Sequence, residues 1–393
     1  MSDEHVKTMT AMYRAVVDSA EYIESRYSAA GLDDISAGES FLLGILARHD
    51  RAGALRLLDG LGFAERDVVA LTDGLGRRGY LRTRAAAPGR SRPAAVLTKR
   101  GMTVVNLSEY ALRAASWADF PLREGDIIVS TPVKCGTTWT QMICALLVFQ
   151  TPDLPGSLPD LSPWLDAEPV ARRETAAALA AQTHRRFIKT HLPLSELPAD
   201  DRVTYVVVGR HLLDAAISYY HHRINAAEHH ERPASGNRRG SSSPRNWLLQ
   251  WIATDTDLHA NRGHLLPDML GHLSEAWARR ADPGVVLLHY EDLSADLEGE
   301  MRNLAARLGI SVPEHAWPAL VKAATFSEMR SAAGRLQPED GLGGAPEKFF
   351  RKGTSGSGRS LLSSAELAYY HARAAQLAPP DCLAWLHRED RSG

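Results

Sequence analysis

The segment DIIVSTPVKCGTTWTQMICALLVF, residues 126–149, restricts the possible folds of this chain more than any other stretch. It begins as a β-rich apolar run, continues through a loop with one glycine and three hydroxyl residues, and enters an amphipathic helical pattern. At such a junction the N–H groups of the helix N-terminus, the helix dipole and a lysine, here Lys134, attract an anion. We therefore predict a phosphate-binding turn between a buried strand and a helix.

This turn differs from the Walker A loop of P-loop kinases. The pattern GxxxxGK[ST] is absent, because Lys134 precedes Gly136 and no hydroxyl residue follows the lysine at the place that would coordinate Mg²⁺. A kinase of similar topology, which would consume ATP with Mg²⁺, is therefore disfavoured. We expect no metal in the site.

Four apolar runs after residue 118 alternate with helical patterns. They are DIIVST, RFIKT, VTYVVVG and VVLLHYE. This alternation is typical of an α/β fold, a parallel sheet with helices on both faces. Because 393 residues exceed one ordinary core, we predict two domains, a mostly helical one over residues 1–117 and the α/β domain over 118–393.

Composition gives little information about partners. The 45 basic and 47 acidic residues give a net charge of −2, which does not favour a nucleic acid or a membrane. The polar start MSDEHVKTMT is unlike a secretory signal, and the longest apolar runs are too short to span a bilayer. The three cysteines fit neither a disulfide framework nor a zinc site. We expect a cytoplasmic protein with reduced thiols.

The first domain resembles the winged helix-turn-helix of MarR-type regulators. Helical patterns over residues 36–48, 54–61 and 65–78 precede a strand, turn and strand over 80–97. A new helix then starts at TKRG. The resemblance implies a recognition helix, a wing and a following helix in that order.

The charges of this domain leave its role open. Eight basic residues and no acidic one lie between Asp73 and Glu109, a pattern able to follow DNA phosphates. They are Arg77, Arg78, Arg82, Arg84, Arg90, Arg92, Lys99 and Arg100. Glu65 and Asp67, at the start of the recognition helix, would repel phosphate. A scaffold or dimerisation role is therefore favoured over direct DNA binding.

The phosphate turn PVKCGTTW resembles the 5′-phosphosulfate loop YPKSGTTW of sulfotransferases that use 3′-phosphoadenosine 5′-phosphosulfate (PAPS). Cys135 replaces the serine of that loop, and the residues that match are Lys134, Gly136, Thr137, Thr138 and Trp139. The resemblance implies that these residues and the Cys135 amide bind the donor. Cysteine is a weaker hydrogen-bond donor than serine, so its side chain is not expected to contribute.

Two further segments resemble motifs of the same family in the order that the family requires. RFIKTHLP resembles its KTHLP stretch, which implies that His191 is the general base and that Lys189 assists at the transferring group. VTYVVVGRHLLDAAISYYHH, residues 203–222, resembles its 3′-phosphate motif, which implies binding by Arg210 and Ser218. A surface Arg210 paired with Asp214 is the alternative.

The C-terminal segment KFFRKGTSGSGRS resembles the family motif RKGxxGDWKN. Arg351, Lys352 and Gly353 match and are expected to close over the 3′-phosphate, whereas the DWKN end is absent. Residues expected around the adenine are Tyr290, Thr325, Phe326 and Trp139. No oligomeric state is predicted, because the dimer motif of the family is unreadable here.

The resemblance implies a PAPS-dependent sulfotransferase that releases 3′-phosphoadenosine 5′-phosphate (PAP). The expected acceptor is a small hydroxylated metabolite, such as a phenol, or an amine. The alternative is a DNA-binding regulator that senses PAPS or PAP without catalysis; an intact base and lysines argue against it. The polar tract over residues 229–246 is either a lid or a solvated insertion.

Overall fold

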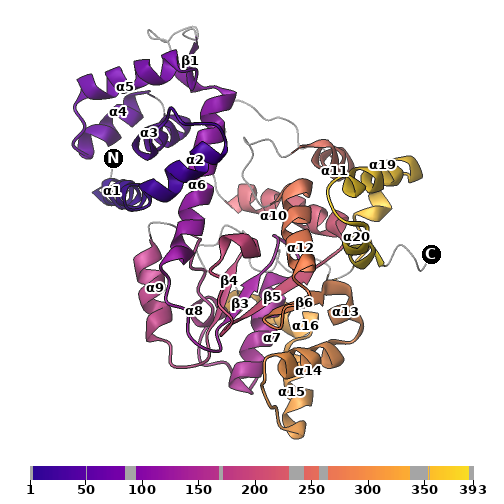
Figure 1. Cartoon of the computed structure of the whole chain (residues 1–393). Helices are drawn as coiled ribbons and strands as arrows, with labels where there is room; N and C mark the ends of the chain where they lie inside the picture. Colours follow the sequence, from indigo (N-terminus) through magenta and orange to yellow (C-terminus); the bar gives the residue numbers. More distant parts are fainter. Residues whose placement is uncertain are drawn as a thin grey trace. The chain divides into compact units, whose positions relative to one another are not determined.

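The computed structural model divides into two compact units (Figure 1). One unit is built mainly from the chain up to Phe120, and the other from most of the chain after Pro121. The residues described are 3–49, 51–84, 94–167, 171–229, 243–255, 264–336, 353 and 355–388. Most of the polar tract expected to be a lid or an insertion, as well as Arg351 and Lys352, lies outside these residues.

The first unit consists of helices and one antiparallel hairpin. Its elements are α1 (Asp3–Asp18), α2 (Ala20–Ala29), α3 (Ala37–Arg48), α4 (Arg51–Gly60), α5 (Glu65–Arg77), β1 (Leu81–Arg84), β2 (Ala94–Leu97) and α6 (Lys99–Ala118). Helix α3 begins at a capping box formed by Ser36 and Glu39, and Thr98 caps α6. The order of elements agrees with the sequence pattern, and the winged-helix assignment stays a prediction.

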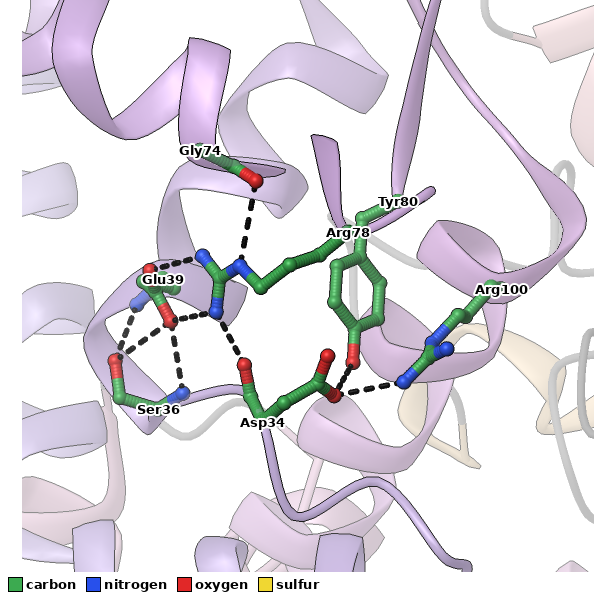
Figure 2. Close-up of polar contacts among 7 residues, drawn as sticks. All are labelled: Asp34, Ser36, Glu39, Gly74, Arg78, Tyr80 and Arg100. Carbon is green, nitrogen blue, oxygen red and sulfur yellow. Dashed lines mark hydrogen bonds and ion pairs between the residues drawn. The ribbon is translucent and has the colours of Figure 1, made fainter. Parts of the chain in front are cut away.

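Two of the basic residues expected near DNA are engaged inside this unit (Figure 2). The Arg78 guanidinium forms an ion pair with Glu39 at 2.5 Å and donates to the Asp34 carbonyl. Arg100 pairs with the Asp34 carboxylate at 2.7 Å and lies 4.6 Å from the centre of the Tyr80 ring. These cations join the end of α5 and the start of α6 to the first turn of α3 and to the loop before it. Their charge is therefore partly neutralised, which further weakens the DNA interpretation.

The second unit contains a four-stranded parallel sheet in the order β4-β3-β5-β6. Its strands are β3 (Ile127–Ser130), β4 (Phe187–Thr190), β5 (Thr204–Gly209) and β6 (Val285–His289). The helices are α7 (Thr137–Phe149), α8 (Leu158–Leu161), α9 (Arg172–Ala181), α10 (Leu212–His229), α11 (Pro244–Ala253), α12 (Leu266–Ala278), α13 (Tyr290–Ala295), α14 (Leu297–Arg307), α15 (Trp317–Ala323), α16 (Phe326–Ser331), α17 (Ala333–Leu336), α19 (Ser364–Ala375) and α20 (Pro380–Leu386). The α/β prediction is confirmed.

Helices cover both faces of this sheet. Alternate strand residues such as Ile127 and Val206 share a core with α7 and α14, whereas α12 lies against β5 and β6 on the other face. This burial explains the continuous apolar strands. No helix in the described ranges is both long and apolar enough to cross a membrane.

The order of the strands determines where a ligand can bind. From β3 the chain first adds β4 on one side and then crosses to add β5 on the other side. At such a switch point the loops that follow the strands diverge and leave a crevice at the carboxyl ends. The loops after β3, β4 and β5 carry Lys134, His191 and Arg210.

Candidate active site

The loop between β3 and α7 is tightly curled. Lys134 has a φ of 64° and Gly136 a φ of 108°, so two of its residues are in the left-handed region. A side chain at Gly136 would have its Cβ 3.2 Å from the Tyr290 ring, so glycine lets the loop approach that ring. A lysine in this region costs free energy, and such residues concentrate at functional sites.

The first turn of α7 follows this loop directly. Thr137, Thr138 and Trp139 occupy it, and the Thr137 hydroxyl is hydrogen-bonded to that of Thr131. The Cys135 amide, expected to be available to the donor, instead donates to the Pro132 carbonyl at 3.2 Å. Burial raises the pKa of the Cys135 thiol to about 12, so this side chain is neutral.

Three basic side chains lie close together at this loop, those of Lys134, Lys189 and Arg210. Burial, and then the charges of Arg210 and Lys189, lower the pKa of Lys134 to about 7. The Arg210 guanidinium donates to the Lys134 carbonyl at 3.0 Å and lies 4.0 Å from the centre of the Tyr290 ring. Arg210 is 8% exposed, and its Nε has no hydrogen-bond partner within the described part of the chain. The arrangement is suited to an anion.

The structure defines the tautomer of His191. Its Nδ1 lies 2.7 Å from the carbonyl oxygen of Thr131, the first residue of the phosphate loop. A carbonyl can only accept, so Nδ1 carries the proton and Nε2 keeps the lone pair of the neutral ring. The imidazole is thereby held at the phosphate loop, with Nε2 as its basic nitrogen.

Trp164 is a site residue that the sequence reasoning missed. Its ring packs edge-on against the His191 ring, with 5.0 Å between centroids, and the Lys189 ammonium lies 4.2 Å from its centre. An aromatic face attracts a cation at this distance. No motif surrounds Trp164 in the sequence, so its role becomes visible only in the fold.

A buried hydrogen-bond network fixes the strand end beside His191. The Ser130 hydroxyl donates to the Leu192 carbonyl at 2.7 Å and lies 3.0 Å from His272 Nε2. Burial lowers the pKa of His272 to about 4, so this ring is neutral and its Nε2–H donates to Ser130. Sequence reasoning missed His272 as well.

A second missed histidine, His222, lies near the cations. Burial, and then the charges of Lys134 and Lys189, lower the pKa of His222 to about 4. This residue lies on α10, one turn after Ser218, which is partly buried on the same helix. His222 is therefore a neutral polar group close to both lysines.

Aromatic residues expected at the adenine meet beside Arg210. The rings of Trp139 and Tyr290 pack edge to face, 5.2 Å apart, and the Trp139 indole N–H donates to the Ala324 carbonyl. Thr325 caps α16. Phe326 lies against Gly353, where an added Cβ would be 2.6 Å from its ring.

The alternative pairing of Arg210 with Asp214 is wrong. The Asp214 carboxylate instead accepts from the backbone N–H groups of Gly356 and Gly358, both at 2.7 Å. Arg210 is buried beside the phosphate loop and is not at the surface. It is thus placed for a ligand of that loop.

Comparisons with known proteins agree with this geometry. A family model described as the sulfotransferase domain matches residues 124–376. A glycolipid sulfotransferase of Mycobacterium bovis is 43% identical over 302 residues, which cover 70% of this chain and 92% of that protein. A glycolipid sulfotransferase of Mycobacterium tuberculosis is 42% identical over 301 residues, with the same coverage of 70% and 92%.

A solved structure supports the fold. The mouse sulfotransferase SULT7A1 complexed with PAP has a TM-score of 0.55 and 19% identity, covering 72% of this chain and 94% of that chain. The family inferred from the motifs is confirmed by the family model and by the mycobacterial relatives. This chain belongs to the PAPS-dependent sulfotransferase family.

Proposed function

We propose that the chain transfers a sulfuryl group in-line from PAPS to an acceptor hydroxyl, with His191 as the general base. The observation that carries this proposal is the hydrogen bond from His191 Nδ1 to the Thr131 carbonyl. It leaves Nε2 as the basic nitrogen and ties the ring to the loop that holds Lys134. A general base needs both a basic nitrogen and that position.

The donor roles follow from the gathered cations. Lys134, Thr137 and Thr138 are assigned to the 5′-phosphate, with Lys134 on its leaving oxygen. Arg210 and Ser218 are assigned to the 3′-phosphate, which distinguishes PAPS from ATP. The buried, unbonded Nε of Arg210 and the lowered pKa of Lys134 both support an anionic ligand in this position.

The remaining donor contacts stay proposals from the sequence. Arg351, Lys352 and Gly353 are assigned to the 3′-phosphate. The adenine is assigned to Trp139, Tyr290, Thr325 and Phe326. Edge-to-face packing of Trp139 on Tyr290, next to Arg210, supports an aromatic wall for a flat base.

In the proposed reaction PAPS supplies the sulfuryl group and PAP is released. The acceptor oxygen forms an S–O bond while the S–O bond to the 5′-phosphate breaks, and His191 Nε2 takes the hydroxyl proton. Lys189 offsets charge on the sulfuryl oxygens, and Lys134 stabilises the charge that develops on the leaving phosphate. The Trp164 ring holds the Lys189 ammonium beside His191.

The acceptor class is proposed from the relatives. Two proteins that are 42–43% identical to this chain over 70% of its length are named glycolipid sulfotransferases, so a sugar hydroxyl on a glycolipid is the first acceptor to test. The comparisons give no support to the phenol expected from the motifs. A phenol, a steroid alcohol and an amine therefore belong in the same panel as alternatives.

The test is to incubate the full chain with labelled PAPS and each acceptor of this panel. We expect label in the product with wild type, and a turnover at least roughly 10²-fold lower for His191→Ala, because general base catalysis typically contributes that factor. PAP affinity should stay within about twofold, since His191 faces the acceptor. His184→Ala is the matched control, because this partly buried histidine contacts the Arg185 carbonyl and the rings of Phe149 and Phe187, which have no assigned role in the reaction. Equal turnover in His191→Ala and wild type would remove His191 from the mechanism.

A further inference from the structure

The glycine loop that follows Gly353 is fastened to the protein by a buried carboxylate. Asp214 is the third residue of α10 and lies one helical turn after Arg210. Its two carboxylate oxygens accept separately, Oδ2 from the Gly356 N–H and Oδ1 from the Gly358 N–H. Asp214 is 4% exposed, so both are charge-assisted bonds shielded from water.

The glycines of this loop allow it to approach α10 closely. A Cβ at Gly358 would lie 2.4 Å from the backbone carbon and oxygen of Leu213, where no side chain fits. Gly356 has a φ of 86°, a conformation that a residue with a side chain rarely adopts. The loop therefore lies directly on the first turn of α10, and only glycine permits this.

A second anchor comes from the element that carries Tyr290. The Ser355 hydroxyl donates to Glu291 Oε1 at 3.0 Å. Burial acts to raise the pKa of Glu291, but hydrogen bonding to His289 and the charge of Arg210 lower it below its usual value. Glu291 is therefore an ionised acceptor, next in sequence to the residue whose ring lies against Arg210.

These contacts divide the loop into two parts with different tasks. The N–H groups of Gly356 and Gly358 are occupied by a carboxylate, so they are not available to a phosphate. A carboxylate one turn from Arg210 would also repel a phosphate, and its two N–H partners compensate that charge. The second half of the loop thus serves as an anchor, and any donor contact of the loop falls on its beginning, at Gly353.

We propose that Asp214 is a positioning residue of the donor site, which sets the place of the glycine loop relative to Arg210 and thereby the affinity for PAPS. This inference rests on the proposed function, because it assumes that Arg210 binds the 3′-phosphate. Asp214 touches no substrate. It acts through Gly356 and Gly358.

The test measures PAP binding by calorimetry and PAPS kinetics with the full chain. For Asp214→Asn we expect the Kd of PAP and the KM of PAPS to rise on the order of tenfold, the effect of about one charge-assisted hydrogen bond. At saturating PAPS, kcat and the KM of the acceptor should stay within about twofold. This separation of donor from acceptor effects would not arise from a general loss of stability.

Asp126→Asn is the matched control. Asp126 is also a buried carboxylate, but it pairs with Arg186 just before β3, at the opposite end of the sheet from the site. We expect this variant to lose stability while it keeps the PAP affinity of the wild type. A rise in Kd equal to that of Asp214→Asn would reduce the effect of Asp214 to stability, and would overturn the proposal.

A second variant covers the case that Asp214→Asn fails to fold. Gly358→Ala keeps the buried carboxylate but places a Cβ against the Leu213 backbone, so it should displace the loop and also raise the Kd of PAP by about tenfold. If the folded variants bind PAP as tightly as wild type, the proposal is wrong. If wild type itself binds no PAP, the proposed function fails instead, and the two failures are thus distinguishable.

Discussion

Binding of PAP should be coupled to uptake of a proton by Lys134. In the structure, burial and the charges of Arg210 and Lys189 lower the pKa of this lysine to about 7. A bound phosphate reverses the local charge, so the pKa should return toward the usual lysine value near 10.5. The bound state then holds more protons than the free state, so binding weakens as pH rises.

The magnitude follows from the two pKa values. At pH 8 the free enzyme has about nine tenths of Lys134 deprotonated, so binding should take up about 0.9 proton, against about 0.5 at pH 7. The Kd of PAP should rise about fivefold from pH 7 to pH 8 and about ninefold from pH 8 to pH 9. Ordinary imidazoles and phosphate monoesters titrate below this window, so their contribution is small.

Calorimetry at pH 8 in two buffers of different ionisation enthalpy measures the proton count directly. The slope of the observed enthalpy against the ionisation enthalpy of the buffer gives the number of protons taken up. Lys134→Arg should lower this number to near zero, because a guanidinium stays charged at pH 8. Lys322→Arg, an exposed lysine outside the site, should leave it unchanged.

Two outcomes would refute this reasoning. A wild-type proton count near zero at pH 8, together with a constant Kd from pH 7 to pH 9, would show that Lys134 is already charged in the free enzyme. An unchanged count in Lys134→Arg would assign the proton to another group. Either result would show that burial and the neighbouring charges of Arg210 and Lys189 do not control the binding of PAP through Lys134.

Two further predictions concern stability and thiol chemistry. Asp34→Ala removes the acceptor of the Tyr80 hydroxyl and of Arg100, so the free energy of unfolding of the first unit, measured with denaturant, should fall by about 1–2 kcal/mol. Asp33→Ala, at an exposed neighbouring residue, is the control. Equal stability of the two variants would contradict the network in Figure 2. All three cysteines are buried and burial raises the pKa of each to about 11 or 12, so a thiol reagent at pH 8 should label none in the native protein and three after unfolding. Rapid labelling of native protein would contradict that burial.

Local sequence was sufficient to predict the phosphate loop and its surroundings. The apolar run, the loop and the helix after residue 126 form the β3 strand, the curled turn and α7. The same holds for β4 and β5, which end directly before His191 and Arg210. Strand character, turn residues and helix starts depend on neighbours within a few positions, so their patterns are visible without the fold.

Tertiary structure decided which side chains complete the site. Trp164 and His272 lie in stretches without a motif, and His222 ends the 3′-phosphate motif without a predicted role. The three residues approach the lysines or Ser130 only because the chain returns to the same edge of the sheet. The partners of Asp214, the backbone N–H groups of Gly356 and Gly358, were not predicted for the same reason. A periodic pattern reports that a residue is buried but not what it is buried against.

The tautomer of His191 and the ion pairs of the arginines in the first unit also depend on the tertiary structure. The sequence supplied a histidine in KTHLP, but the carbonyl of Thr131, sixty residues earlier, decides which nitrogen of His191 is basic. It also supplied a cluster of arginines in the first unit, yet Arg78 is paired with Glu39 in the first turn of α3 and Arg100 with Asp34 in the loop before that helix. Hydrogen bonds and ion pairs act over a few ångströms in space, and the distance along the chain between their partners is unrestricted.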